Sequence, residues 1–244
     1  MKKTITIFKN IYRKIIDLKY NKFSRMNLSR DSFVINFHNV LSPTDNKNER
    51  YQVSVSEFID TLNYIKQRGY KFTSIEYLLE HYNEMCCSIT FDDGYENVIH
   101  FAYPIMLKNN IEFCLFLVND YIGMQGYLSK NQIKQMMDSG LCTVGSHTLS
   151  HNYLAKSNDV KYQLCQSKKL LESLFGTSIQ YFAYPYGTPL SYNKHVIKTV
   201  EQCGYIYAFS TIKATLNDYS VKNRYTLPRI DSEYFIKQYI KGGN

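Results

Sequence analysis

The sequence lacks several features that would place it in a specialised class of protein. No apolar run approaches the roughly 20 residues needed to span a bilayer, no tract is of low complexity, and no internal repeat can be aligned. The 244 residues are 44% hydrophobic and 20% charged, as in a globular protein. This length is enough for one large α/β domain with a hydrophobic core.

Cysteine occurs without the spacing of a metal or redox motif. Nothing resembles C-x-x-C, and two of the six cysteines are neighbours in sequence, which places them poorly for bonding to each other. We expect all six to be buried thiols in a reducing compartment. They are Cys86, Cys87, Cys114, Cys142, Cys165 and Cys203.

The first 30 residues lack the features of a secretion signal. They hold nine Lys or Arg and one acid, with apolar residues interleaved among the charges and no small-residue cleavage site. Phe8, Ile11, Tyr12 and Ile15 lie at helical spacing. Residues 1–30 are therefore predicted to be a basic segment: either an amphipathic helix on an anionic membrane or a surface helix covering one end of the domain. We expect a cytoplasmic protein, peripheral at the inner membrane face if this helix binds lipid.

Positive charge exceeds negative charge along the chain. The 29 Lys and Arg against 21 acids give a net charge of +8 at pH 7. This balance favours anionic partners such as lipid head groups or phosphate-linked glycans. No nucleic-acid-binding motif accompanies the charge, so nucleic acid is not an expected partner.

Strand-like and helix-like segments alternate through residues 31–244, which we predict to form one domain. Such alternation is typical of parallel βα units. Strands are expected at 33–38, 87–91, 111–118, 141–145, 179–183 and 205–210. Helices are expected from Ser54 to Gly69, from Thr73 onwards, at 96–109 with a break at Pro104, at 129–140, 160–175 and 190–203, and at 231–241 capped by Asp231.

Residues 88–94 carry an apolar, β-prone run that ends in two acids and a glycine. Neighbouring side chains of a strand point to opposite faces, but Asp92 and Asp93 can both reach one site where the strand stops and the chain turns. Adjacent carboxylates repel each other, so a buried pair needs a cation or a shared proton.

Two histidines, His147 and His151, follow about fifty residues later at i, i+4. One turn of helix or a compact loop places both imidazoles on one side. One carboxylate and two histidines form a ligand set for a catalytic divalent metal ion with open positions. The other carboxylate is then free to act as a base.

Four short segments occur in order along the chain: T-F-D-D-G at 90–94, S-H-T-L-S-H at 146–151, F-A-Y-P-Y-G at 182–187 and L-P-R-I at 227–230. The first three resemble the motifs of the polysaccharide deacetylase family (NodB homology, carbohydrate esterase 4). The fourth resembles a closing segment of its poly-N-acetylglucosamine deacetylase branch. The resemblance extends from about residue 33 to residue 230 and implies a distorted, incomplete (β/α) barrel of about seven strands.

The predicted strands agree with such a barrel. His38, Asp92, Asp93, His147 and Pro185 all follow predicted strands. In barrels, the carboxyl ends of the strands carry the chemistry.

The resemblance implies that Asp93, His147 and His151 bind one divalent ion and that Asp92 is the general base. Zinc suits two imidazoles and a carboxylate, and cobalt, nickel or iron could substitute. The backbone N–H of Tyr186 would stabilise the oxyanion.

The turn around Tyr186 follows from its neighbours. Pro185 and Gly187 shape it, since proline fixes φ and glycine tolerates conformations that other residues avoid. Tyr184 and Tyr95 are weaker candidates for substrate contact.

Two departures from the family pattern affect the catalytic groups. Many members carry an arginine that holds the catalytic aspartate where this chain has Ala183; Arg229 could reach the same carboxylate, or form a surface salt bridge instead. Many also carry a late histidine as general acid, but no histidine follows His195 here. His38 is the leading replacement, with a core or supporting histidine as the alternative.

The predicted function is metal-dependent removal of N-acetyl groups from amino sugars in surface-polysaccharide assembly. The substrate would be an N-acetylated glycan, or a lipid-linked or nucleotide-linked sugar precursor. A deacylase or deformylase acting on another amide is the alternative among enzymes. A catalytically inactive glycan-binding protein on the same fold is the alternative of another class.

Overall fold

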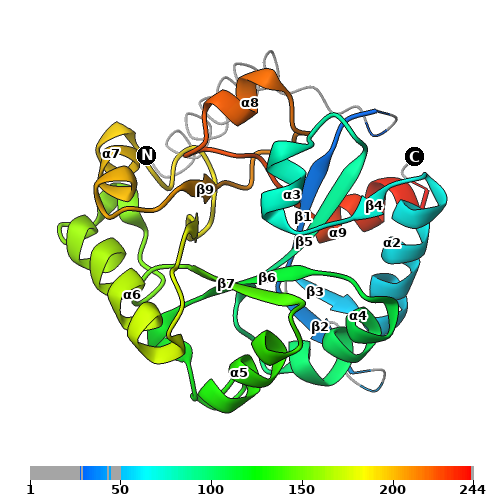
Figure 1. Ribbon diagram of the computed structural model, residues 1–244, viewed down its shortest axis with the longest axis horizontal. Helices are drawn as coiled ribbons and strands as arrows, with labels where there is room; N and C mark the ends of the chain where they lie inside the picture. Colours follow the sequence, from blue (N-terminus) through cyan, green and yellow to red (C-terminus); the bar gives the residue numbers. More distant parts are fainter. Residues whose placement is uncertain (1–27, 29, 43, 45–50, 243–244) are drawn as a thin grey trace, which may run out of the picture.

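A parallel β-sheet forms the centre of the molecule (Figure 1). The computed structural model describes residues 28, 30–42, 44 and 51–242. The predicted N-terminal helix therefore lies outside the described residues, apart from Leu28 and Arg30. Within the described residues, no helix combines the length and apolarity needed to cross a membrane.

Seven strands follow one another in the order β10-β1-β5-β6-β7-β8-β9, and β4 pairs with β5 beside this series. All of these pairings are parallel. The seven are β10 (Ile230–Asp231), β1 (Phe33–Phe37), β5 (Cys86–Asp93), β6 (Phe113–Leu117), β7 (Cys142–Ser146), β8 (Tyr181–Ala183) and β9 (Tyr207–Phe209). The eighth is β4 (Lys71–Phe72), and β2 (Asn39–Leu41) pairs separately with β3 (Gln52–Ser54).

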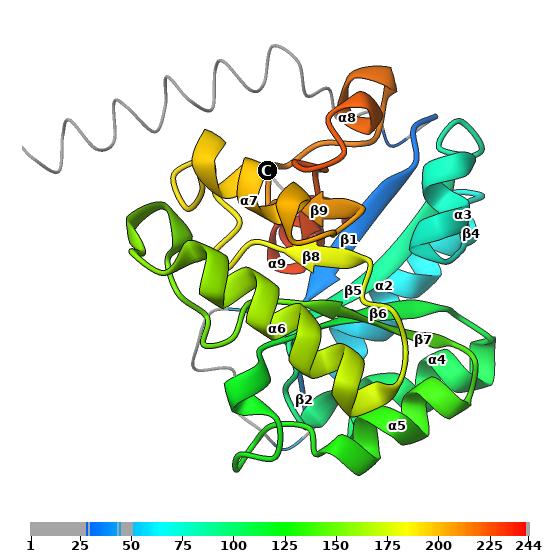
Figure 2. The same cartoon turned by 60° about the vertical axis from the view of Figure 1, so that its left-hand side comes forward.

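Helices surround the sheet and connect its strands (Figures 1 and 2). Both predicted capping boxes are present: Ser54 with Glu57, and Ser129 with Gln132. The α-helices are α2 (Val55–Gln67), α3 (Ile75–Glu80), α4 (Tyr103–Asn109), α5 (Lys130–Asp138), α6 (Val160–Phe175), α7 (Lys194–Gln202), α8 (Asp218–Lys222) and α9 (Ser232–Phe235). Short 3-10 helices cover Asn119–Tyr121 and Leu154–Lys156, and π-helices cover Val98–Ala102 and Ile236–Ile240.

The two faces of the sheet bury different apolar clusters. In β1, Phe33, Ile35 and Phe37 belong to the cluster that packs against the surrounding helices, whereas Val34 belongs to the inner cluster. This alternation is the period of two expected of a strand covered on both faces. The inner cluster also holds Leu78 of α3, and Thr73, just before α3, donates to Cys87 at the start of β5. Helix α3 therefore covers the amino ends of the strands, and the carboxyl ends are left for a site.

Residues 227–231 close the gap between the two ends of the sheet. Leu227 exchanges backbone hydrogen bonds with the β9 segment, donating to Ala208 and accepting from Ser210. Three residues later Ile230 pairs with Ile35 of β1. Arg229, between these contacts, is thereby placed inside the barrel with none of its surface exposed.

Most predicted elements are present, but several boundaries differ. Strand β5 includes Asp92 and Asp93, which the sequence had placed after the strand. Ser74, rather than Thr73, caps α3, because its side chain accepts from the Tyr77 amide. The sequence did not predict β2, β3, β4, β10 or α8, all of five residues or fewer, which carry too little periodicity to be recognised.

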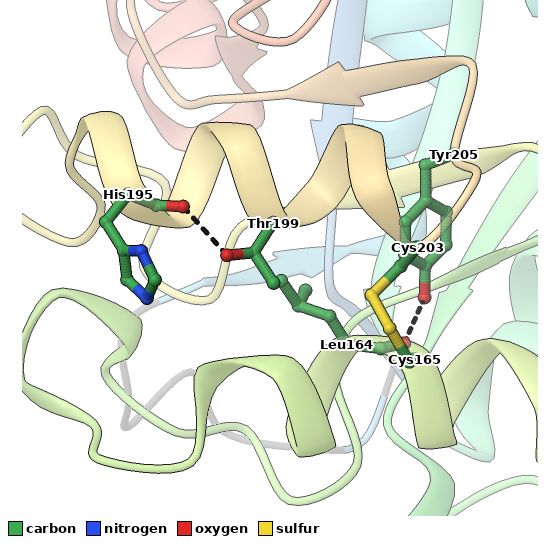
Figure 3. Close-up of a disulfide and its surroundings, with 6 residues drawn as sticks. All are labelled: Leu164, Cys165, His195, Thr199, Cys203 and Tyr205. Carbon is green, nitrogen blue, oxygen red and sulfur yellow. Dashed lines mark hydrogen bonds between the residues drawn. A yellow bond between two sulfur atoms is a disulfide. The ribbon is translucent and has the colours of Figure 1, made fainter.

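The prediction that all six cysteines are thiols is wrong for two of them. Cys86, Cys87, Cys114 and Cys142 are free and buried, as predicted. Cys165 of α6 and Cys203 at the end of α7 form a disulfide across the two helices (Figure 3). Both cysteines are half-buried. They meet only because α6 packs against α7, and no local sequence pattern indicates that contact.

We expect this disulfide to stabilise the fold. The bonded residues are 38 positions apart, and closing such a loop is worth roughly 4 kcal/mol in the chain-entropy model, with about 2–4 kcal/mol typical. Guanidinium unfolding of the Cys165→Ala/Cys203→Ala variant should show a loss of this size. Reductant should lower the stability of the parent protein and leave the variant unchanged. A parent protein indifferent to reductant would contradict the prediction.

Candidate functional site

The carboxyl ends of three strands of the sheet, β1, β5 and β7, bring the predicted site residues together. His38 directly follows β1, Asp92 and Asp93 end β5, and His147 directly follows β7. Because parallel strands end at the same edge, residues far apart in sequence meet here.

The backbone at Asp93 explains how two adjacent acids serve one site. Asp93 adopts φ +69°, followed by Gly94 at φ +82°. This left-handed turn ends the alternation of the strand, so Asp93 is not directed to the opposite face from Asp92. A Cβ on Gly94 would lie 2.9 Å from the Leu117 side chain, so glycine also fits the space.

Asp93, His147 and His151 form a compact cluster of potential metal ligands. Asp93 Oδ1 lies 3.5 Å from His147 Nε2 and 3.3 Å from His151 Nε2. One donor atom from each of the three lies within 4.8 Å of the others. Among the described residues, this is the one group of three or more His, Cys, Asp or Glu side chains that is close enough together to hold a metal ion.

A backbone hydrogen bond to the ring nitrogen that faces away from Asp93 orients His147. Its Nδ1 donates to the backbone oxygen of Ala183 at 2.8 Å, which leaves Nε2 to face Asp93. Such a contact to the second ring nitrogen is the usual support of a metal-binding histidine. Burial lowers the pKa of His147 to about 3, so the imidazole is neutral and able to donate its lone pair.

The loop that carries His151 is held by its own side chains and by α6. The His151 amide donates to Thr148 Oγ1 at 2.9 Å, and Gln163 of α6 accepts from the amide and hydroxyl of Ser150. Thr148 and His151 both have positive φ, at +71° and +58°. Left-handed backbone in non-glycine residues is costly, and it concentrates at functional sites.

The chemistry of the cluster fits a divalent cation. Asp93 Oδ1 is buried and has no hydrogen-bond partner in the described residues. Burial and the adjacent Asp92 charge raise the pKa of Asp93 to about 7. A cation between the carboxylate and two neutral imidazoles would satisfy this oxygen and stabilise its charge.

Asp92 is held by Arg229 in a buried, two-pronged ion pair. Arg229 Nη1 and Nη2 donate to Asp92 Oδ1 and Oδ2, each at 2.7 Å. Burial alone would raise the pKa of Asp92, but the Arg229 charge and hydrogen bonds, with His147, hold it well below its usual range. The contact is therefore no surface salt bridge, since both side chains are almost fully buried.

Three further groups position Arg229. Its Nε donates to the Ser210 carbonyl at 3.2 Å, and Nη1 also donates to Thr90 Oγ1 at 3.2 Å. The guanidinium lies over the Phe116 ring, 5.2 Å from its centroid. Thr90 was not predicted as a site residue, although it stands two residues before Asp92 and so on the same face of β5.

His38 lies at the edge of the site. Its Nε2 is 3.9 Å from Asp92 Oδ2, and its ring is 4.5 Å from that of Tyr51. Burial lowers the pKa of His38 to about 4, against the opposing effect of Asp92. The side chain is therefore neutral at neutral pH and within reach of the aspartate.

The turn at 185–187 borders the cluster on another side. Tyr186 has φ +62°, is 53% exposed, and places its ring 4.9 Å from that of His151. The turn is fastened by Thr211, which donates through its amide to the Gly187 carbonyl and through its hydroxyl to the Tyr186 carbonyl. The Tyr186 amide donates to no group in the described part of the chain, so it is available to a ligand.

Tyr184 does not join the site, and its predicted contact with substrate is not supported. It is 1% exposed, stacks on Tyr192 at 4.1 Å, and donates its hydroxyl to the Tyr225 carbonyl. Tyr184 directly follows β8. Ala183 belongs to the inner apolar cluster, whereas Phe182 and Tyr184 belong to the cluster under the surrounding helices, so the alternation of the strand directs Tyr184 into the core. Tyr95 does lie near the site and stacks on Tyr127 at 5.1 Å.

Comparison with known proteins places these observations in a family. A family model described as polysaccharide deacetylase matches residues 80–208, just over half of the chain. The poly-β-1,6-N-acetyl-D-glucosamine N-deacetylase of Staphylococcus aureus is 27% identical over 238 residues, covering 87% of this chain and 80% of that protein. Bacillus subtilis YxkH is 32% identical over 131 residues, 53% of this chain but only 46% of that protein.

Two solved structures share the fold. A polysaccharide deacetylase from Bacillus cereus superposes with a TM-score of 0.74 at 23% identity, covering 85% of this chain and 68% of that one. IcaB from Ammonifex degensii gives a TM-score of 0.68 at 25% identity, covering 82% of this chain and 91% of that one. The predicted incomplete barrel of about seven strands is confirmed: seven parallel strands form one series, with β4 beside β5.

The ligand cluster predicts one bound divalent ion per chain. Calorimetric titration of zinc into chelator-treated protein should give a stoichiometry of about one. His147→Ala should weaken binding on the order of 10²-fold or more, because even supporting partners of a ligand are worth about 10–100-fold. His195→Ala, which removes an exposed histidine of α7, should bind like the parent. Unchanged affinity in His147→Ala would refute the assignment.

The Arg229–Asp92 pair predicts a pH-dependent loss of stability in Arg229→Gln. At pH 7 the variant leaves a buried carboxylate unpaired, which costs about 3–5 kcal/mol. In the parent the pKa of Asp92 is lowered, so its stabilisation is present above the unfolded pKa of about 3.9 and is lost only below that value. In the variant, burial without Arg229 raises the pKa of Asp92, so the carboxyl takes up a proton as pH falls and the cost of the unpaired charge is relieved. The difference between variant and parent should therefore shrink from pH 7 towards pH 4.

Urea unfolding at both pH values measures this difference. Arg224→Gln is the matched control, because Arg224 is exposed and its loss should change stability by no more than about 0.5 kcal/mol. A destabilisation of Arg229→Gln that is independent of pH would show that the ion pair is not its cause.

Proposed function

Because the chain belongs to the polysaccharide deacetylase family, we propose that it is a metal-dependent hydrolase that removes N-acetyl groups from the amino sugars of a glycan. One observation carries this proposal: a three-residue ligand cluster lies beside an aspartate that is buried, ionised and held by Arg229. An inactive relative would be expected to have lost a ligand or the base, and all four side chains are in place.

Asp93, His147 and His151 would hold the ion. A divalent ion there supplies a Lewis acid that polarises the acyl carbonyl and lowers the pKa of a water molecule. Zinc is the ion best suited to two imidazoles and a carboxylate, although the donor set also accepts cobalt, nickel or iron.

Asp92 would accept the proton of the attacking water. The ion pair with Arg229 keeps Asp92 ionised and fixes both carboxylate oxygens, so the position of the carboxylate is set before substrate binds. The Tyr186 amide, which has no other acceptor in the described residues, would donate to the negative charge that develops on the acyl oxygen.

His38 would return the proton to the departing nitrogen. It is neutral at neutral pH, so it cannot begin the reaction as an acid. Its Nε2 is 3.9 Å from Asp92 Oδ2. The proton taken from water can pass from Asp92 to His38, and from there to the amine as the C–N bond breaks.

The substrate and cellular role follow from the relatives. The staphylococcal relative acts, by its name, on poly-β-1,6-N-acetyl-D-glucosamine, so a glycan of N-acetylated amino sugars in surface-polysaccharide assembly is the leading candidate. A lipid-linked or nucleotide-linked precursor remains an alternative substrate of the same chemistry.

The disulfide bears on where the protein works. A cytoplasmic location stays a prediction, but disulfides persist chiefly in oxidising compartments. Cys165–Cys203 therefore supports activity on the outer side of the membrane. Acid quenching of whole cells, followed by alkylation at neutral pH in denaturant and mass spectrometry, should find Cys165 and Cys203 unalkylated and the other four cysteines alkylated.

Acetate release from N-acetylglucosamine oligomers tests the function. The zinc-loaded protein should release acetate, and chelation should abolish release. Asp92→Asn keeps size and should retain zinc while losing on the order of 10²-fold or more in turnover, as expected for a general base. A variant that lost zinc instead would reverse the roles of Asp92 and Asp93.

Two comparisons separate the alternatives. His38→Ala should reduce hydrolysis of the amide far more than that of an activated acetate ester, whose leaving group needs little protonation. Release of formate or another acid instead of acetate would favour the broader deacylase function. Glycan binding without release of any acid would favour an inactive binding protein.

A further inference from the structure

Asn36 is a polar side chain in an otherwise apolar strand. Strand β1 reads F-V-I-N-F, and all five of its residues are buried. Asn36 has none of its surface exposed, yet neither the oxygen nor the nitrogen of its amide has a hydrogen-bond partner among the described residues. Buried amides are nearly always hydrogen-bonded, because an unpaired one is costly, so this side chain calls for an explanation.

Strand pairing places Asn36 inside the barrel, directly beneath the site. Asn36 is in register with Thr90 of β5, and Thr90 supports Arg229 inside the barrel. On this face His38 follows Asn36 by two residues, as Asp92 follows Thr90. The 3.9 Å between His38 Nε2 and Asp92 Oδ2 shows that His38 is indeed directed to this face.

The side chains in register with Asn36 are already engaged elsewhere. On one side, Thr90 Oγ1 donates to the backbone oxygen of Ile35 at 3.1 Å. On the other side, Asn36 is in register with Asp231, whose Oδ1 accepts from the Tyr234 amide at 3.0 Å. In the described part of the chain, neither flanking strand therefore supplies a partner for the Asn36 amide.

His38 carries a second unpaired atom on the same face. Its Nδ1 is buried and has no hydrogen-bond partner in the described residues. Side chains two residues apart on one face of a strand are separated by about 6.6 Å along the strand, which is too far for a direct hydrogen bond. One water molecule that bonds to both at about 2.8 Å spans most of that distance. Such a water needs at least two polar partners, and these side chains supply them.

The tautomer of His38 gives this contact a role. The ionised Asp92 lies on the Nε2 side of the ring and favours the tautomer that has its proton on Nε2. In that tautomer, Nε2 cannot accept a proton from Asp92. A hydrogen-bond acceptor beside Nδ1 favours the opposite tautomer, in which Nδ1 holds the proton and Nε2 keeps its lone pair.

We infer that Asn36 is a positioning residue: through a buried water, its amide oxygen accepts the hydrogen bond of His38 Nδ1–H and keeps Nε2 free to receive the proton of Asp92. This inference rests on the proposed function. The O–H bond of Asp92 breaks as the N–H bond at Nε2 forms, and that bond breaks in turn as the departing nitrogen takes the proton. With none of its surface exposed, Asn36 acts through His38 and not on substrate.

The tautomer tests the inference without any turnover. In protein labelled with ¹⁵N in its histidine rings, the two neutral tautomers give different nitrogen shifts, and the His38 signals are those lost in His38→Ala. The ring is neutral at neutral pH, because burial lowers the pKa of His38 to about 4. We expect the proton on Nδ1 in the parent and a shift towards Nε2 in Asn36→Leu. A proton on Nε2 in the parent, or the same tautomer in both proteins, would overturn the inference.

Kinetics on the zinc-loaded protein with N-acetylglucosamine oligomers provide the second test. Asn36→Leu should lower kcat about tenfold or more and leave KM and zinc stoichiometry unchanged, and it should affect an activated acetate ester less. Asn36→Ser keeps an acceptor oxygen and should retain most of the turnover. In a His38→Ala background, Asn36→Leu should cause no further loss, because the two residues act as one unit. Asn109→Leu removes an exposed asparagine of α4 and should match the parent.

The outcomes separate this inference from the proposed function. Equal losses from Asn36→Leu with and without His38 would show that Asn36 does not act through His38, and would leave the hydrolase proposal standing. If Asn36→Leu fails to fold, Asn36→Val takes its place, because valine is smaller than leucine and suits a strand. A parent protein that shows the Asn36-dependent tautomer but releases no acetate would support the contact and overturn the hydrolase proposal.

Discussion

The ion pair between Arg229 and Asp92 is the interaction on which the site depends. A carboxylate almost fully buried at the end of a strand cannot remain ionised without a partner of opposite charge. The partner stands 137 positions later in sequence, in the segment that joins β9 to β1. This segment joins the two ends of the sheet through its backbone, and its Arg229 side chain keeps Asp92 charged and fixes both carboxylate oxygens. Thr90, Ser210 and Phe116 hold the guanidinium in turn, so Asp92 is oriented by buried groups of the fold.

Much of the fold and the ligand set could be predicted from sequence because the signals are local. The capping boxes at Ser54 and Ser129 are formed as predicted, and strands buried on both faces give continuous apolar runs. Asp93, His147 and His151 stand at strand ends, where parallel topology collects them. The boundary errors at Thr73 and at the end of β5 are of the one- or two-residue kind expected where several polar residues compete for a cap or a turn.

What the sequence could not show depends on distance in space. Cys165 and Cys203 carry no mark of their pairing, because it arises only when α6 and α7 pack together. Tyr184 and Tyr186 are both tyrosines of one motif, yet strand geometry sends the first into the core, and a left-handed turn sends the second to the surface. Tyr121 packs beside His151, and Tyr127 packs on Tyr121; both contacts arise only in the folded chain. With 23 tyrosines in the chain, composition alone could not single them out.

The placement of Arg229 also has a consequence for how the protein is made. Synthesis delivers the chain from its amino end, and Asp92 emerges from the ribosome long before Arg229. Until residues 227–231 bridge β9 and β1, the inner face of the sheet is open and Asp92 has no countercharge. During that interval Asp92 must be either hydrated or protonated, because a buried carboxylate without a countercharge is unstable. The pairing of residues 227–231 with β9 and β1 therefore completes the surroundings of Asp92 late, and a chain that ends before Arg229 lacks the countercharge of this aspartate.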